Sequence, residues 1–490
     1  MDKLLLACFF LLSPILLCAQ KKPLPGLDLI RTEDLKKDLF EFAGSKFNGR
    51  SAGTLDELKA AVWLAEKYRK IGLKPAGDDG TYFQYFTLWR NQIANSSYIR
   101  LNNSPLELWK DVAVSQMANV QLNGEIVYLG NALSIDTNSV DVKGKIVALE
   151  ADPKGINLDV SLPTWRYNRY IFLKYGMPLV RKGASAILFI ADETAERAWN
   201  DAVENFKRGS YDIDGGPNVN VNTTVPVLWL HSTAKKEIEN KSTTFSTNIV
   251  VNKYPYPSVN VVGVVDGTDA ILKSEYLLYS GHTDAHGIRN KIKGDSIYYG
   301  ADDNGSVNVA MLANARAFAK NPAKRSVLFV IHGAEERGLL GSRYYSTHAT
   351  VPIAKVVAVL NGDMIGRNHI DSAAILGSVP PHRNSLDLVT MALSANAEGP
   401  KFKLDNTWDQ PAHIEGWYFR SDHLPYARLG IPSLMYTTLL HPDYHTPQDN
   451  AQNINYLKLK KMADWMYRTG WKVANTDKRP STDKDFKLER

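Results

Sequence analysis

The residues best suited to chemistry include a short acidic loop bounded by glycines, Gly300-Ala301-Asp302-Asp303-Asn304-Gly305-Ser306. Two adjacent carboxylates usually belong to a solvated turn, so the pair alone predicts only a loop. Other candidate ligands lie on both sides of it along the chain: His282 and Asp284 before it, and Glu335, Glu336, Asp363, Tyr444 and His445 after it. Two imidazoles with hard carboxylate oxygens and no thiolate suit divalent metal ions, with zinc first and manganese or cobalt as alternatives.

A pair of ions about 3.5–4 Å apart needs a carboxylate and a water that bridge them. Asp302 or Asp303 can supply this carboxylate. Because neighbouring side chains on an extended backbone diverge, we expect the other one to be structural. The pair Glu335 and Glu336 divides similarly, into one ligand and one free base that moves a proton from the nucleophile to the leaving amine.

The elements expected to position these residues alternate between strand and helix from Asn260 onward. The spacing predicts strands at 277–280, 326–331, 356–361, 373–377 and 433–438, and helices at 307–318, 341–348, 385–395 and 454–473. Several of the candidate residues follow the end of a strand, which is where the loops of an open α/β sheet converge on ligands. Asp284, two residues after His282, can orient its imidazole. We therefore expect a mixed, mostly parallel α/β sheet with helices on both faces.

The segment 96–255 differs from the rest of the chain. Strands predominate there, predicted at 124–129, 146–150, 186–190 and 225–230. Of the eleven histidines only His231 precedes residue 282, so we expect no metal site in this segment. The predicted division is a discontinuous domain of residues 20–95 and 256–475, an insertion of residues 96–255, and a loose charged tail of residues 476–490.

Length and composition are those of a soluble globular protein of two or three units, with 490 residues, 44% of them hydrophobic and 22% charged. The net charge of +6 is modest, and the lysines and arginines are scattered among acidic residues. This pattern gives no case for a nucleic-acid partner. No feature of the sequence indicates an oligomeric state.

The N-terminus is typical of a secretory signal peptide. Residues 4–17 are nearly all apolar but too few to span a bilayer. We expect a signal peptide of residues 1–19, cleaved near Ala19, so that the protein is periplasmic or secreted and the mature chain has no stable membrane span. Cys8 and Cys18 both fall inside this segment, which excludes a cysteine nucleophile and a cysteine-rich zinc site.

Five stretches, in this order, resemble the co-catalytic zinc aminopeptidase and glutamate carboxypeptidase family with an inserted protease-associated domain. They are Gly281-His282-Thr283-Asp284, Gly300-Ala301-Asp302-Asp303-Asn304, Glu335-Glu336-Arg337-Gly338-Leu339-Leu340-Gly341-Ser342, Asn361-Gly362-Asp363-Met364-Ile365-Gly366 and Asp443-Tyr444-His445-Thr446-Pro447. Arg420-Ser421-Asp422-His423 also fits. The resemblance extends from about residue 30 to 475. It implies a zinc exopeptidase fold with two Zn²⁺ ions, and a β-rich α/β protease-associated domain as the insertion.

The resemblance also implies a ligand set. Asp302 would bridge both zinc ions, and Asp303 would hold the loop in shape, with a cis peptide between the two. The other ligands would be His282 and Asp363 for one ion, and Glu336 and His445 for the other.

The remaining implied roles concern the reaction. Glu335 would be the general base, and Tyr444 would stabilise the tetrahedral intermediate. Arg420, Asp422 and His423 are candidates to line the substrate site. Four histidines near the site, His286, His332, His423 and His441, are predicted to be structural or substrate-lining, not ligands.

The sequence thus predicts an exported zinc-dependent exopeptidase. The first interpretation is an aminopeptidase that acts on peptide or protein N-termini through a metal-bridging water activated by the glutamate base. One alternative is a carboxypeptidase or dipeptidase, for which Arg367 and Arg420 could hold a free carboxylate. Two others are a one-metal aminoacyl cyclase and a catalytically silent scaffold with a protease-associated domain.

Overall fold

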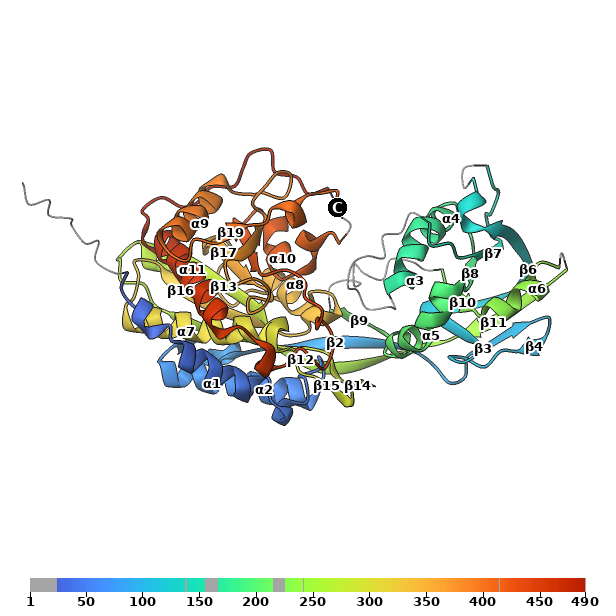
Figure 1. Ribbon diagram of the computed structural model, residues 1–490, viewed down its shortest axis with the longest axis horizontal. Coiled ribbons are helices and arrows are strands. Elements are labelled where there is room, and N and C mark those ends of the chain that lie inside the picture. The colour runs from blue at the N-terminus through green and yellow to red at the C-terminus, as the bar shows by residue number, and fades with distance from the viewer. Residues whose placement is uncertain are drawn as a thin grey trace, which may run out of the picture.

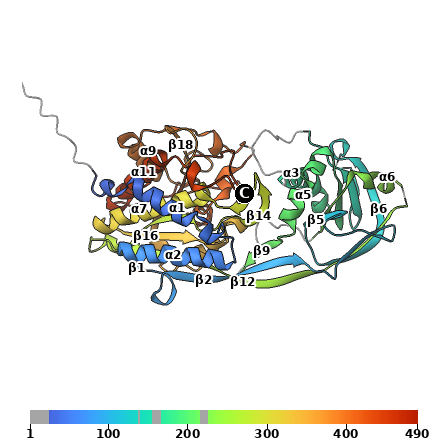
Figure 2. The same ribbon diagram turned by 60° about the horizontal axis from the view of Figure 1, so that its bottom comes forward.

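The computed structural model describes residues 24–136, 139–154, 166–214, 225–240, 242–413 and 415–489. The expected signal peptide, residues 1–19, lies outside these ranges. Figures 1 and 2 show two lobes joined by a ribbon of two long antiparallel strands, β2 (Phe83–Ile93) and β12 (Val251–Val265). Among the described helices, none is both long enough and apolar enough to cross a membrane.

The larger lobe is built on a ten-stranded mixed sheet in the order β19-β18-β20-β17-β13-β16-β12-β2-β9, with β1 also paired to β12. The strands besides β2 and β12 are β1 (Lys74–Pro75), β9 (Ser210–Ile213), β13 (Tyr276–His282), β16 (Ser326–His332), β17 (Val356–Gly362), β18 (Ser372–Leu376), β19 (Lys403–Leu404) and β20 (Ser433–Thr437). The central strands β20, β17, β13 and β16 are parallel, whereas β12, β2 and β9 run antiparallel to their neighbours. The expected mixed α/β fold is confirmed, with its parallel pairing concentrated at the centre.

Helices cover both faces of this sheet because successive strand residues point to opposite sides. Leu277 and Tyr279 of β13 share a core with α1, α2, α7, α9 and α11, whereas Leu278 packs with Tyr345 of α8 and Tyr426 of α10. The helices are α1 (Thr32–Phe42), α2 (Leu55–Ile71), α7 (Val307–Lys320), α8 (Leu340–Thr347), α9 (Leu386–Glu398), α10 (His423–Arg428) and α11 (Tyr456–Asn475). The four predicted helices of the C-terminal half correspond to α7, α8, α9 and α11.

The smaller lobe is built on a second sheet in the order β4-β3-β11-β6-β7-β8-β10-β5. Its strands are β3 (Tyr98–Leu101), β4 (Ser104–Pro105), β5 (Val112–Gln116), β6 (Val120–Asn131), β7 (Ile146–Glu150), β8 (Ala186–Ile190), β10 (Val227–Leu230) and β11 (Thr244–Ile249). Its helices are α3 (Arg166–Ile171), α4 (Met177–Arg181), α5 (Glu193–Phe206) and α6 (Lys235–Ile238). A two-stranded hairpin of β14 (Gly287–Ile292) and β15 (Asp295–Tyr298) stands apart from both sheets.

The two lobes are less cleanly divided than the predicted boundaries at 95/96 and 255/256. Residue 255 falls inside β12, which continues from one lobe into the other. From the middle of the expected insertion, β9 returns to the larger sheet and pairs with β2, where Ile213 lies opposite Leu88. The long ribbon explains both differences, because its strands belong to the larger sheet yet extend toward the smaller lobe.

The C-terminal tail was expected to be loose, but its described residues are tied to the larger lobe. Asp483 accepts a 2.8 Å hydrogen bond from Arg383 Nε, and its N–H donates to the carbonyl of Asn384. Glu489 Oε1 lies 2.6 Å from His382 Nε2, whose other ring nitrogen is 3.0 Å from Asp409 Oδ1. Charged composition favoured a loose tail, but it cannot reveal partners that lie about a hundred residues away.

These contacts predict a pH-dependent stability. Burial opposes the charged form of His382, but Asp409 and Glu489 outweigh it and raise its pKa above the ordinary value. A histidine with a raised pKa contributes stability that is fully present below the unfolded-state pKa of about 6.5 and is lost as pH rises through the folded-state pKa. His382→Gln should therefore lower the free energy of unfolding by about 1.5–3 kcal/mol near pH 5.5 and by less near pH 9. Denaturant unfolding at both pH values checks this, with substitution of the exposed His348 by Gln as control, and a pH-independent difference would contradict it.

Candidate metal centre

The central parallel strands end at one edge of the large sheet, and the predicted ligands gather there. His282 is the last residue of β13, Asp363 follows β17, and the Glu335–Arg337 turn follows β16. His445 lies in the loop after β20, and the Ala301–Ser306 turn precedes α7. The side chains that face one another are at most about a tenth exposed.

Asp303 lies at the middle of this group. Its Oδ1 is 3.2 Å from His282 Nε2, and its Oδ2 is 3.0 Å from His445 Nε2. One carboxylate thus faces two imidazoles from different loops, one with each oxygen. The structure therefore places Asp303, and not Asp302 as expected, in the position of a bridging carboxylate.

Asp302 has the structural role that was expected of its neighbour. Its Oδ1 accepts a 2.6 Å hydrogen bond from the Gly366 N–H, and its Oδ2 lies 3.4 Å from His441 Nε2. Both oxygens are therefore directed at other groups, away from the imidazoles of the site. The cis peptide also differs from the expected position, since it joins Asp303 to Asn304.

Around Asp303 the remaining side chains form two groups of possible ligands. In the first, His282 Nε2 lies 4.0 Å from Asp363 Oδ1 and 3.7 Å from Glu335 Oε2. In this group, and in the second group of His286, Glu336 and His445, one possible ligand atom from each residue lies within 4.8 Å of those of the other two. This spacing is compatible with a shared ion.

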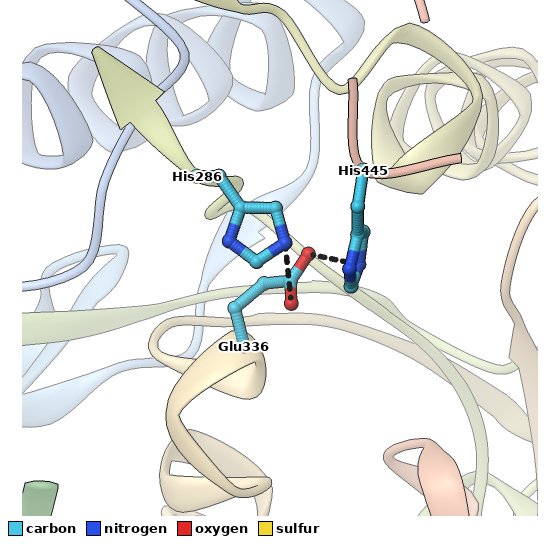
Figure 3. Close-up of side chains that lie close together, drawn as sticks. All are labelled: His286, Glu336 and His445. Atoms are coloured by element: carbon cyan, nitrogen blue, oxygen red, sulfur yellow. Dashed lines mark ion pairs between the residues drawn. The ribbon is translucent and has the colours of Figure 1, made fainter. Parts of the chain in front are cut away.

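The second group consists of Glu336, His445 and His286. Glu336 Oε1 is 3.2 Å from His445 Nε2, and Glu336 Oε2 is 3.3 Å from His286 Nε2. Figure 3 shows the two imidazoles directed at the same carboxylate. His286 was predicted to be structural or substrate-lining, and the structure brings it to this group.

The charges in the site favour bound cations. Burial raises the pKa of Glu335 well above its ordinary value, and neighbouring Glu336 and Asp363 raise it further. Burial, together with Asp303, likewise raises the pKa of Asp363. Asp303 itself stays ionised, because His282 and His445 outweigh its burial and hold its pKa well below the ordinary range.

Several buried atoms that could bind a metal ion have no hydrogen bond in the described part of the chain. Within the described residues, His282 Nε2, His445 Nε2 and Glu336 Oε1 are buried without a hydrogen bond. Buried polar groups normally have partners, and the nitrogen and oxygen donors here are those that zinc prefers. The residues present therefore fit a pair of divalent ions.

Asp284 positions the glutamate pair. Its carboxylate accepts hydrogen bonds from the backbone N–H groups of Glu335, at 2.9 Å, and Glu336, at 3.2 Å. It was expected to orient His282 with this carboxylate, but the nearer partner of His282 Nδ1 is the Asp284 carbonyl, at 3.1 Å. One residue thus holds two ligand-bearing segments.

Two further carboxylates hold backbone around the site. Asp449 accepts hydrogen bonds from the N–H groups of Asp302 and Asp303, at 2.8 and 3.1 Å. Glu57 accepts from Ala334, immediately before the glutamate pair, and from Ser258. Glu57 is fully buried, and burial followed by repulsion from Asp284 raises its pKa to about 8.

Arg50 connects the loops from the N-terminal side. It is fully buried, and its guanidinium donates to three carbonyls of the site: Thr283 at 2.7 Å, Tyr299 at 2.8 Å and Gly300 at 2.9 Å. These carbonyls belong to the loop after β13 and to the segment that leads into the acidic turn. A single side chain thereby connects the segment that follows His282 to the segment that precedes Asp303.

The predicted substrate-lining residues separate into different places. Asp422 is buried, and burial raises its pKa to about 6. His423 instead packs its ring edge-on against Tyr418, 4.8 Å away, and has no contact with the ligands among the described residues. Arg420 pairs with Glu415 at 2.6 Å.

Tyr444 stacks on the imidazole of His445, with ring centroids 3.6 Å apart. Arg166, from α3 of the smaller lobe, places Nη2 3.4 Å from the Tyr444 hydroxyl. Figures 1 and 2 show α3 on the side of that lobe that faces the larger one. The smaller lobe thus places the guanidinium group of Arg166 at the edge of the candidate metal centre.

Sequence reasoning missed several positioning residues: Arg50, Glu57, Arg166, Glu415 and Asp449. None of them lies in a motif with ligand spacing. The sequence does contain a signal for His286, because it is the second histidine of His282-Thr283-Asp284-Ala285-His286. The family resemblance, however, already implied a complete set of metal ligands without it.

The chain is similar in sequence to known peptidases. Residues 260–469 match the model of peptidase family M28. Over 192 residues the chain is 29% identical to aminopeptidase YwaD of Bacillus subtilis (strain 168). That match covers 38% of this chain and 40% of YwaD, so it spans less than half of the length of this relative.

Solved structures show the same fold over nearly the whole chain. The aminopeptidase from Aneurinibacillus sp. strain AM-1 superposes with a TM-score of 0.59 at 17% identity, covering 94% of this chain and 98% of that one. BSAP, a zinc aminopeptidase from Bacillus subtilis, gives a TM-score of 0.57 at 18% identity, with 94% and 99% covered.

The two adjacent aspartates can be separated by experiment. Asp303→Ala should abolish tight binding of both ions, because both imidazoles face its oxygens. Asp302→Ala should keep both ions and lose at most about 10–100-fold in affinity, as for residues outside the ligand set. Zinc per chain, measured by mass spectrometry after dialysis, checks this. Retention of two ions by Asp303→Ala with their loss from Asp302→Ala would contradict the assignment.

Proposed function

We propose that this chain, which belongs to peptidase family M28 through residues 260–469, is a zinc-dependent aminopeptidase that releases N-terminal residues from peptides. The observation that carries the proposal is the carboxylate of Asp303, which faces His282 with one oxygen and His445 with the other. Glu335, whose carboxyl group lies in the same buried site, would act as the base.

The ligand set follows from these contacts. Asp303 would touch both ions, with His282 and Asp363 completing one position and Glu336 and His445 the other. When bound, two zinc ions supply Lewis acidity toward the scissile carbonyl and lower the pKa of water.

Glu335 would move the proton. Its Oε2 lies 3.7 Å from His282 Nε2, and burial raises its pKa well above the ordinary value of a glutamate. A carboxylate with a raised pKa takes a proton more readily, which suits a general base. In this mechanism Glu335 takes a proton from the attacking water and gives it to the amine that leaves.

Tyr444 would donate a hydrogen bond to the oxygen that gains charge during attack. Burial raises its pKa well above the ordinary value, so the phenol keeps its proton. Stacking on His445 and the contact with Arg166 hold the ring in place. A preorganised donor of this kind typically contributes a factor of about 10²–10³ in rate.

The acidic surroundings favour a cationic substrate group. Asp422, with both carboxylate oxygens buried and without a hydrogen bond inside the described part of the chain, acts electrostatically on Glu335 and Asp363. A free α-amine brings a positive charge to such a site, and this complementarity supports an aminopeptidase.

One observation favours a second function, that of a carboxypeptidase or dipeptidase. Arg420 Nη2 and Arg166 Nη1 lie 2.6 and 3.8 Å from the same oxygen of Glu415. Two guanidinium groups around one carboxylate leave a positive charge near Tyr444, where a free substrate carboxylate could bind. Arg367, the other candidate for this role, is paired with Asp443 at 2.6 Å.

Three finer points also belong to this proposal. The apolar segment at residues 4–17 supports export, with cleavage near Ala19. The smaller lobe would be the protease-associated domain, and Arg166 supports a role for it in admitting substrate. The substrates would be the N-termini of peptides or proteins.

The base can be tested without disturbing the ions. Glu335→Gln should keep two zinc ions per chain and lose roughly 10²–10⁴-fold in kcat, because the amide cannot accept the proton. Stopped assays on aminoacyl chromogenic substrates, paired with zinc analysis, measure both. The exposed Glu66→Gln is the matched control. Near-normal turnover in a zinc-replete Glu335→Gln enzyme would overturn the role of Glu335.

Blocked peptides distinguish the two candidate functions. An aminopeptidase should cleave a peptide with a free N-terminus and an amidated C-terminus, and should leave the N-acetylated peptide with a free C-terminus intact. Arg166→Gln should then leave the KM of the amidated substrate nearly unchanged, because Arg166 contacts Tyr444 and would bind no substrate carboxylate. Cleavage of only the N-acetylated peptide, with a raised KM in Arg166→Gln, would instead establish the carboxypeptidase.

A further inference from the structure

His286 is held beside the metal centre by its backbone neighbours. The N–H of Ala285 donates to the carbonyl of Arg50, and the N–H of Gly287 donates to the carbonyl of Gly49 at 3.0 Å. The chain on both sides of His286 is therefore bonded to the same N-terminal loop that positions the rest of the site. This arrangement fixes the backbone from which the imidazole extends, and His286 is 8% exposed.

The imidazole lies at ligand distances from two residues of the second group. Its Nε2 is 3.3 Å from Glu336 Oε2, and its ring centre is 4.0 Å from that of His445, with the planes nearly perpendicular (Figure 3). Donors about 2.0–2.1 Å from a tetrahedral zinc ion are about 3.3–3.4 Å from one another. The separations of Glu336 from His286 and from His445, 3.3 and 3.2 Å, match that spacing.

An ion pair with Glu336 alone would not account for this placement. Neither ring nitrogen of His286 has a hydrogen bond with the described part of the chain, although Nε2 faces a carboxylate oxygen. Buried polar atoms normally have a partner, and an imidazole nitrogen is one of the ligands that zinc prefers.

We propose that His286 is a ligand of the ion held by Glu336 and His445, so that the two metal positions have unequal donor sets. The position of Glu336 would have two imidazoles and the position of Asp363 only one. Imidazole favours zinc and cobalt, whereas carboxylate oxygen suits manganese and magnesium. The Glu336 position should therefore hold zinc or cobalt more tightly and lose it last. This inference rests on the proposed two-metal function.

Metal titration of the full-length enzyme tests the proposal. Apoenzyme prepared with a chelator is titrated with Zn²⁺ in competition with a chromophoric indicator, and separately with Co²⁺ while its visible absorption is recorded. The variants are His286→Ala and His286→Gln, the second of which preserves side-chain bulk. His348→Ala is the matched control, because the exposed side chain of this histidine at the α8 C-terminus contacts Thr347 and Tyr344. Thermal unfolding of each apoenzyme reports whether a variant has lost its fold.

We expect two binding steps in the wild type and in His348→Ala. Both His286 variants should weaken the tighter step by more than about 100-fold, beyond the 10–100-fold typical of residues outside the ligand set, and should change the Co²⁺ spectrum of that step. The weaker step should stay nearly unchanged. Two unchanged steps, or two steps weakened equally, would overturn ligation by His286. Failure of the wild type to bind two ions would instead overturn the proposed function.

Discussion

Carboxylates crowded into one buried site impose the constraint on which the rest of this structure depends. The acidic residues that share the site are Asp303, Glu335, Glu336, Asp363 and Asp422. Two like charges about 4 Å apart repel by roughly 4 kcal/mol at an effective dielectric constant of 20. Burial and this repulsion explain why the pKa values of Glu335 and Asp363 are raised. Bound divalent cations would relieve this repulsion. The close spacing of the carboxylates would then contribute to the affinity for the cations.

The remainder of the fold keeps these groups together against their repulsion. The parallel strands bring the ligands to one edge, and a set of buried charged residues then fastens the loops through backbone groups: Arg50, Glu57, Asp284 and Asp449. Holding the loops in these positions strains the backbone locally. Ala334, Met364 and His445 adopt left-handed backbone conformations with φ between 53° and 56°. Such conformations in residues other than glycine concentrate at functional sites.

The sequence was a good guide to the catalytic sheet and to the types of ligand. Strand periodicity and the glycines and acids after each strand predicted where His282, Glu335, Asp363 and His445 would meet. It could not distinguish Asp302 from Asp303, because adjacent residues share the same motif and only the backbone of the turn decides which carboxylate faces the imidazoles. Arg50 and Arg166 were missed for a related reason, since their partners lie far away in the chain or in the other lobe.

Anomalous X-ray diffraction at the zinc absorption edge tests most directly whether Asp303 bridges two zinc ions. Crystals of the zinc-loaded enzyme should show two anomalous peaks about 3.5–4 Å apart, with one oxygen of Asp303 bonded to each. A single peak, or two peaks joined through Asp302, would contradict this account.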